Sequence, residues 1–282
     1  LSAISSSQSK RAHQARIAGL GDVHPEVRRV ALELLPDNDP LALIPGLIEA
    51  KKFEQIASLG ATAAPALIRA AQAEPGGQTG ERQRYSAVQA LISLGATVAV
   101  PALRSLLMDR ADTIRAVSTL GLASFGDREM IPIITERVQH SIYVIERSAA
   151  ATALSLLLEE APLLKCLEDE HAAVRQAVAG GISDAGALAA LLNDTAKTVR
   201  DTAAQQLGSL GQTETLIQGF DAGDEQTRRS ITASIHPLWA VDSDGALQLI
   251  ETACRAHQAQ VRSDALDAIA DARLDALPVV LD

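Results

Sequence analysis

Apolar residues recur every three or four positions along most of the chain, separated by turns rich in Gly, Pro and Asp. In the segment 27–35, for example, Val27, Ala31 and Leu34 fall on one face of a helix. This period is typical of amphipathic helices that bury one side. The pattern therefore predicts an all-α protein of short helices joined by tight turns.

The segment 169–211 shows that these helices belong to a repeated unit. Laid on itself at an offset of 25 residues, it places Asp169 on Asp194 and Arg175 on Arg200. Each copy has a turn led by Asp, a helix that opens with Val-Arg, a Gly, and a second apolar helix. A unit of this length cannot bury its own apolar face, so it is stable only when stacked on a neighbour.

The same unit extends along nearly the whole sequence. The six-residue interval from Asp to Arg also joins Asp22 to Arg28 and Asp109 to Arg115. Proline stands near the start of the intervening apolar helices, at Pro65 and Pro101, where its missing N–H removes no helical hydrogen bond. We expect one domain over residues 1–282, with a degenerate unit at 51–60 that lacks the Arg.

Three segments depart from the regular pattern. Residues 74–82 form a polar loop rich in Gly and Pro, which predicts a hinge. Gly180 and Gly181 should weaken the shortest repeat and change the curvature there. The tail 275–282 is similar to the first helix of another unit, so we expect a C-terminal half-repeat whose apolar surface is covered by another segment, or by the continuation of the repeats in a larger chain or complex.

Composition narrows the choice of partner. Aromatic residues make up only 2% of the chain, which leaves few rings for stacking on bases. The formal net charge is −10, and residues 142–282 carry 10 Lys and Arg against 21 Asp and Glu. This balance argues against nucleic acid and favours a protein partner with a basic surface for the second half.

Few features of the sequence indicate a catalytic, metal-binding or cofactor-binding site. Cys254 and His257 share a helical face but lack further ligands, so we expect no metal, and no cofactor motif occurs. No pattern of catalytic residues stands out, which favours a non-enzymatic function. The two Cys show no paired spacing and no apolar run is long enough to span a bilayer, so a cytoplasmic location is expected.

The alternation of a Pro-containing helix, an Asp-led turn and a Val-Arg helix resembles the HEAT repeat, in the variety named after phycobilisome lyases. The resemblance implies a right-handed α-solenoid of about nine helical hairpins. It also implies a ladder in which the Arg of one repeat binds the Asp of a neighbouring repeat. Two functions follow: a protein-interaction scaffold, or, as the alternative, a subunit of a bilin lyase or isomerase.

The helical register also predicts a binding surface. If Val and the small residues after it face the core, the residue after the Arg and the one four positions later face the concave side. The same register places Ala233 and Asp267 beside this row. Together with the single Trp, the partner-binding residues we expect are Arg29, Tyr85, Gln89, Gln176, Asp201, Gln205, Arg229 and Trp239.

Overall fold

The computed structural model describes residues 11–13, 15, 16, 19, 22, 24–34, 47, 52–73 and 77–271. All regular structure in these ranges is helical, which confirms the predicted all-α class. The chain divides between Ile134 and Thr135 into two compact units, called unit 1 and unit 2 below. The number of hairpins, about nine, stays a prediction.

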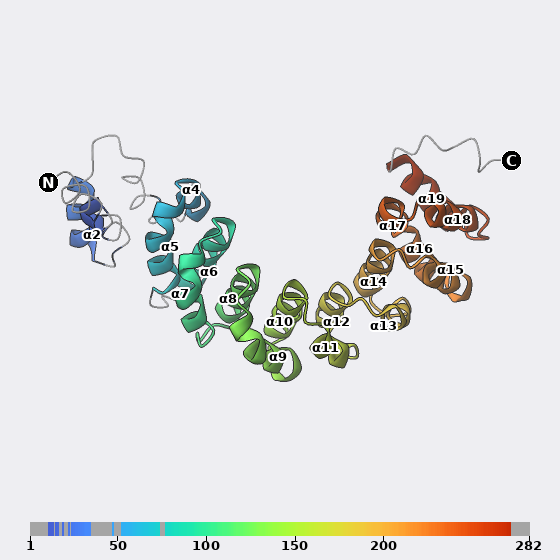
Figure 1. Cartoon of the computed structure of the whole chain (residues 1–282), viewed down its shortest axis with the longest axis horizontal. Coiled ribbons are helices and arrows are strands. Elements are labelled where there is room, and N and C mark those ends of the chain that lie inside the picture. The colour runs from blue at the N-terminus through green and yellow to red at the C-terminus, as the bar shows by residue number, and fades with distance from the viewer. Residues whose placement is uncertain are drawn as a thin grey trace. The chain divides into compact units, whose positions relative to one another are not determined.

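Unit 1 is built from short helices that pack in pairs. Its helices are α2 (Pro25–Glu33), α4 (Phe53–Ser58), α5 (Ala64–Ala71), α6 (Gly77–Ser93), α7 (Val100–Leu106) and α8 (Asp112–Ser124). The helix α5 packs on α6 and α7 packs on α8, while α6 and α8 lie side by side as the second helices of their pairs (Figure 1). Pro65 and Pro101 occupy the first turns of α5 and α7, as predicted.

Unit 2 repeats this arrangement. After α9 (Ile131–His140), which contains the division, come α10 (Val144–Leu156), α11 (Glu160–Leu163), α12 (Ala172–Ala179), α13 (Ala185–Leu191), α14 (Lys197–Ser209), α15 (Thr213–Ala222), α16 (Glu225–Thr232), α17 (Ile235–Val241), α18 (Ser243–Cys254) and α19 (Ala259–Asp271). The second helices α10, α12 and α14 contact one another in turn, and α14 contacts α16 and α17 (Figure 1). The first helices α13, α15 and α18 form the other layer.

One second helix of unit 2 is broken into α16 and α17. Pro237 has no N–H to donate to the carbonyl of Ala233 four residues earlier, and its ring crowds that carbonyl. The helix accordingly ends at Thr232 and restarts at Ile235. Proline therefore sets the point at which this second helix changes direction.

The turns that end α4, α6, α8, α10 and α14 share a residue with positive φ. After α14, Gly211 has a φ of 65°, and Gln212 N–H donates to the Leu207 carbonyl at 2.9 Å. This is the Schellman arrangement, which favours glycine because a side chain is strained at positive φ. The corresponding residue after α10 is Leu158, which has a φ of 59° and a side chain that is 89% exposed.

Replacing this leucine should stabilise the protein. Leu158→Gly relieves the left-handed strain and removes an apolar side chain that packs on little, so we expect a gain of about 0.5–1 kcal/mol after the greater flexibility of glycine is subtracted. Urea unfolding measures the change. As the control, Leu210→Gly falls at a C-cap with a φ of −89° and should destabilise. A loss of stability in Leu158→Gly would contradict the strain assigned to this turn.

The predicted ladder joins consecutive repeats, and we call each contact a rung. In unit 2, Arg175 donates from Nε and Nη2 to the two oxygens of Asp194, at 2.6 and 2.8 Å. Arg147 binds Asp169 in the same way. Each Arg also donates from Nη1 to a carbonyl of the turn before its own helix, at 2.7 Å for Arg175 and Asp169. A guanidinium fork thus ties two turns together.

The ladder has a corresponding rung in unit 1, from Arg84 to Asp109. Asp22 differs, because its partner is Arg69 of α5, while the side chain of Arg28 lies outside the described residues. A further pair that the repeat did not predict joins Arg104 of α7 to Asp127, with both contacts at 2.7 Å. Arginines of both helix layers therefore contribute to the contacts between turns.

Breaking one rung should destabilise the protein in a pH-dependent way. The hydrogen bond from Arg175, opposed by burial and aided by the Ala196 N–H, lowers the pKa of Asp194 below its ordinary value of 3.8. The unfolded chain therefore binds this proton first as the pH falls. The stabilisation is complete above about pH 4 and is lost as the pH falls through the lower folded-state pKa.

For Asp194→Asn we expect a loss of roughly 2–3 kcal/mol at pH 7, since the Arg175 charge loses its carboxylate in a largely buried site. The difference from the unchanged protein should shrink below about pH 4, where Asp194 is itself protonated. Urea unfolding across this pH range tests both statements. Asp221→Asn, at an exposed residue with no ion pair, serves as the control. A difference that stays constant with pH would contradict the pKa shift.

The irregular segments are only partly as expected. Residues 77–82, placed in the 74–82 loop by sequence, form the start of α6, where Glu81 accepts a hydrogen bond from Thr113 of α8. This tertiary contact supports helix despite the glycines, and residues 74–76 lie outside the described residues. The helix α12 ends at Ala179, and the curvature change at 180–181 stays a prediction. The half-repeat 275–282 also lies outside the described residues.

Candidate functional site

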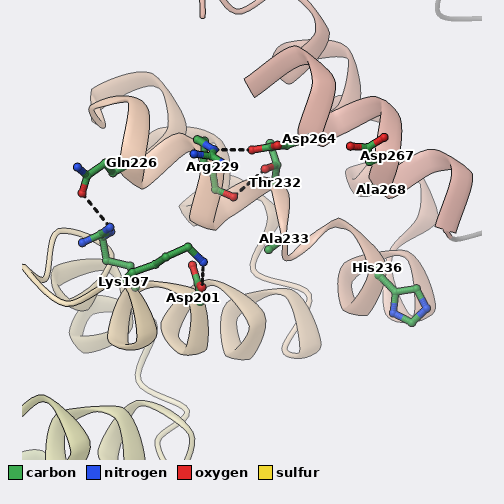
Figure 2. A pocket seen from close by; sticks show the side chains of 11 residues that line it. Lys197, Asp201, Gln226, Arg229, Thr232, Ala233, His236, Asp264, Asp267 and Ala268 are labelled. Carbon is green, nitrogen blue, oxygen red and sulfur yellow. Dashed lines mark hydrogen bonds and ion pairs between the residues drawn. The ribbon is translucent and has the colours of Figure 1, made fainter. Parts of the chain in front are cut away.

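A pocket of about 820 Å³ opens on the second-helix face of unit 2 (Figure 2). The helix α14 forms one wall and α19 the other, with α16 and the start of α17 between them. Its lining residues are Lys197, Arg200, Asp201, Gln226, Arg229, Thr232, Ala233, His236, Asp264, Asp267 and Ala268. This volume is within the range of small-ligand sites and also accommodates a few side chains of a partner.

The pocket exists where the second helix is broken at Pro237. Ala233, at the break, lies on the pocket surface. Behind it, α14 approaches closely because Gly208 has no side chain: a Cβ there would lie 2.8 Å from the Ser234 carbonyl oxygen. This glycine lets α14 lie close to the start of α17, beside the break.

Two ion pairs line the pocket. Lys197 Nζ lies 2.5 Å from Asp201 Oδ2 within α14, and Arg229 Nε lies 2.7 Å from Asp264 Oδ2, joining α16 to α19 (Figure 2). Burial acts to raise the pKa of Asp264, but hydrogen bonds from Gln260 and Arg229 outweigh it and lower the pKa overall. Asp264 is therefore ionised at neutral pH and holds Arg229 in place.

Arg200 differs from the other pocket cations because only neutral groups accept its hydrogen bonds, while the carboxylates of Asp194 and Asp224 interact with its charge from beyond ion-pair distance. Its side chain is largely buried, since the residue is only 6% exposed. Nη1 donates to the carbonyls of Asp194 and Thr195, and Nη2 donates to Gln226 Oε1 at 3.0 Å. Where the two preceding rungs of unit 2 have an Asp, this one has a glutamine.

The structure brings together only some of the sequence-predicted site residues. Asp201 and Arg229 line the pocket, and so do Ala233 and Asp267 of the neighbouring row. Gln176 and Gln205 are exposed on α12 and α14, outside the pocket lining, and Trp239 is half-buried on α17. In unit 1, Arg29 pairs with two glutamates of α2, and Gln89 donates to the Tyr85 hydroxyl at 3.0 Å.

Several lining residues were not predicted as site residues from the sequence. They include Lys197, Gln226, Thr232, His236 and Asp264, and Arg200 was expected to have only a structural role. Spacing offers one signal for two of them, because Lys197 and Asp201, like Asp264 and Ala268, are four residues apart and share a helix face. The break at Pro237 is the other signal, since a widened gap between helices leaves room for a pocket.

In the described part of the chain, no group of three or more His, Cys, Asp or Glu side chains is arranged to hold a metal ion. Burial raises the pKa of the Cys166 thiol and of the Cys254 thiol, so both are protonated at neutral pH. Within the same ranges, no helix has the length and apolar character of a membrane span.

The paired helices and the Arg–Asp rungs give the chain the fold of HEAT-like helical repeats, as the resemblance predicted. No protein-family model and no curated protein matches the sequence. Among solved structures, the complex of CpcE and CpcF of phycocyanin lyase from Nostoc is similar over 90% of this chain and 94% of the other, with 19% identity and a TM-score of 0.47.

Two further structures are similar. Human deoxyhypusine hydroxylase matches over 96% of this chain and 99% of its own, with 15% identity and a TM-score of 0.36. A designed armadillo repeat protein matches over 92% of this chain and 99% of its own, with 17% identity and a TM-score of 0.24.

The close approach behind the pocket gives a test of its packing. Gly208→Ala places a methyl group against the backbone of Ser234, which cannot move without shifting α17, so we expect a loss of about 1–3 kcal/mol despite the better helix propensity of alanine. Thermal unfolding measures this loss. The control is Gly180→Ala, whose Cβ would lie 3.6 Å from the nearest atom, the Thr202 Cγ2. Similar effects of the two substitutions would contradict the close packing.

Proposed function

We propose that the chain is a non-enzymatic scaffold that binds another protein on the concave face lined by the second helix of each repeat. One observation carries this proposal: successive second helices of unit 2 expose polar side chains, and α14, α16 and α19 also line the pocket. Gln176 on α12, Gln205 on α14 and Arg229 on α16 are exposed. A preformed surface of this kind limits the ordering that binding requires.

The charge of the second half supports a partner with a basic surface. Residues 142–282 carry 21 acidic against 10 basic side chains, and such an excess accelerates association with an oppositely charged protein. Several acidic side chains are already paired within the described structure, such as Asp169, Asp194 and Asp264. The net negative charge then attracts the partner at long range. The direct contacts are made by the exposed polar side chains of the second helices and by the pocket.

A partner captured from cell extract, then identified and purified, allows the surface to be tested. The double variant Gln176→Arg and Gln205→Arg puts two cations on the proposed binding face, where they repel a basic partner and fill space. We expect its Kd to rise at least about tenfold, equivalent to about 1.4 kcal/mol. Isothermal titration calorimetry at two salt concentrations gives the Kd and its dependence on charge.

The matched control carries the same change of charge on the other layer. Gln218→Arg and Gln248→Arg lie on the exposed sides of the first helices α15 and α18. Equal weakening by the two double variants would show that net charge, not the second-helix face, controls binding. Transfer of a tetrapyrrole to an acceptor cysteine in the presence of the purified chain would instead support the lyase alternative and overturn the scaffold.

A further inference from the structure

The rung at Arg200 is incomplete. At Arg147 and Arg175, Nε and Nη2 bind both oxygens of one Asp carboxylate. At Arg200, Nη2 binds the amide oxygen of Gln226, and the buried Nε has no hydrogen-bond partner. Among the described residues, none places a carboxylate within ion-pair distance of Arg200.

An arginine in this state is an unusual feature of a folded protein. A buried charge is normally paired, and a buried donor without an acceptor destabilises the structure. The other hydrogen bonds of Arg200 go to two backbone carbonyls, which fix the guanidinium, while Asp194 and Asp224 interact with its charge only from beyond ion-pair distance. The edge formed by Nε and Nη2 is therefore positioned to receive a carboxylate, which matches it with two parallel hydrogen bonds.

The pocket makes this edge reachable. Arg200 and Gln226 both line it, and Gln226 is an exposed residue at the start of α16, free of the core. A rotation of the Gln226 side chain would expose Nη2 and Nε to an incoming group. An incoming group can therefore displace the Gln226 side-chain amide from the position that an Asp carboxylate has in the two preceding rungs.

The opposite wall supplies the complementary charge. Asp267 of α19 lines the pocket and is exposed, and among the described residues no cation lies within ion-pair distance of it. The side-chain Oδ1 of Asp201 is also buried without a donor. The pocket therefore holds one cation without a carboxylate and one carboxylate without a cation.

We propose that Arg200 receives a carboxylate side chain from the protein partner, and that the same partner segment presents a Lys or Arg to Asp267. This inference rests on the proposed scaffold function and names the chemistry that the pocket recognises. A segment with both charges also suits the acidic second half, which would repel a purely acidic peptide. The recognised element is then a short stretch with an acidic and a basic residue close together.

The test uses short synthetic peptides as probes of the wild-type chain. Acetylated and amidated peptides with a central Glu-Ala-Lys, Gln-Ala-Lys or Glu-Ala-Gln are titrated while the Arg200 Nε–H resonance is followed by ¹H–¹⁵N NMR. The signal is identified by its loss in Arg200→Lys. We expect the Glu-Ala-Lys peptide to shift it, the Glu-Ala-Gln peptide to shift it more weakly, and the Gln-Ala-Lys peptide to leave it unchanged.

A substitution within the chain provides the decisive variant. Gln226→Glu is isosteric and places a carboxylate of the chain itself next to Arg200. It should therefore raise the stability of the fold and increase the Kd of the Glu-Ala-Lys peptide at least about tenfold. Gln258→Glu is the matched control, since Gln258 accepts from Arg228 Nη1 at 3.1 Å in the next rung, where all three Arg nitrogens are bonded. It should leave peptide binding unchanged.

The possible results separate this inference from the scaffold function. The carboxylate site is overturned if no peptide shifts the Arg200 Nε–H resonance. It is also overturned if Gln226→Glu and the wild type bind the Glu-Ala-Lys peptide equally tightly. If the captured partner protein binds Gln226→Glu as tightly as the wild type, the carboxylate site fails while the scaffold stands. If no protein partner binds the wild type at all, the scaffold function itself fails.

Discussion

The contact between an arginine of one repeat and the turn of the next determines how this fold holds together. Each hairpin is too small to bury its apolar face, so it depends on its neighbours. Aliphatic packing between helices supplies most of the stabilisation but specifies position weakly, since alanine and leucine tolerate small shifts. A guanidinium that binds a carboxylate and a carbonyl together, as Arg175 does, fixes the two turns to a defined distance and orientation.

The candidate site follows from two departures from that regular ladder. Pro237 breaks a second helix and opens space between α14 and α19 within unit 2. Gln226 replaces the carboxylate of a rung, so Arg200 keeps its structural carbonyl contacts while one edge stays unsatisfied. Either change alone would be a local irregularity. Together they place a buried arginine, whose Nε has no acceptor among the described residues, next to an accessible pocket.

The sequence predicted the fold well because the interactions that define it are local and repeated. Apolar period, first-turn prolines and the Asp-to-Arg interval each recur, and the rungs at Asp169 and Asp194 follow directly from the predicted ladder. The local structures that the sequence did not predict depend on tertiary contacts. Residues 77–82 are helical despite their glycines, and Leu158 adopts a conformation that the composition of its turn does not reveal.

The candidate site was predictable only in part, for a physical reason. Register places Asp201, Arg229 and Asp267 on one face, because each lies at a fixed offset from a repeat arginine. It cannot show that Arg229 joins Asp264 across two helices, since that contact depends on how far Pro237 displaces α16. The structural arginines were set aside as a class, and Arg200, which has no carboxylate within ion-pair distance among the described residues, was set aside with them.

The same residue type can therefore hold a repeat together or recognise a partner, depending on a side chain one repeat away. With Asp at the facing position, both edges of the guanidinium are satisfied and the arginine is closed to ligands. With Gln226 facing Arg200, the carbonyl contacts persist and the fold keeps its geometry, while the buried Nε has no acceptor among the described residues. A repeat protein can acquire a binding site in this way without new loops. Each rung already holds an oriented guanidinium, which needs only the loss of its carboxylate partner and a neighbouring pocket to bind a ligand.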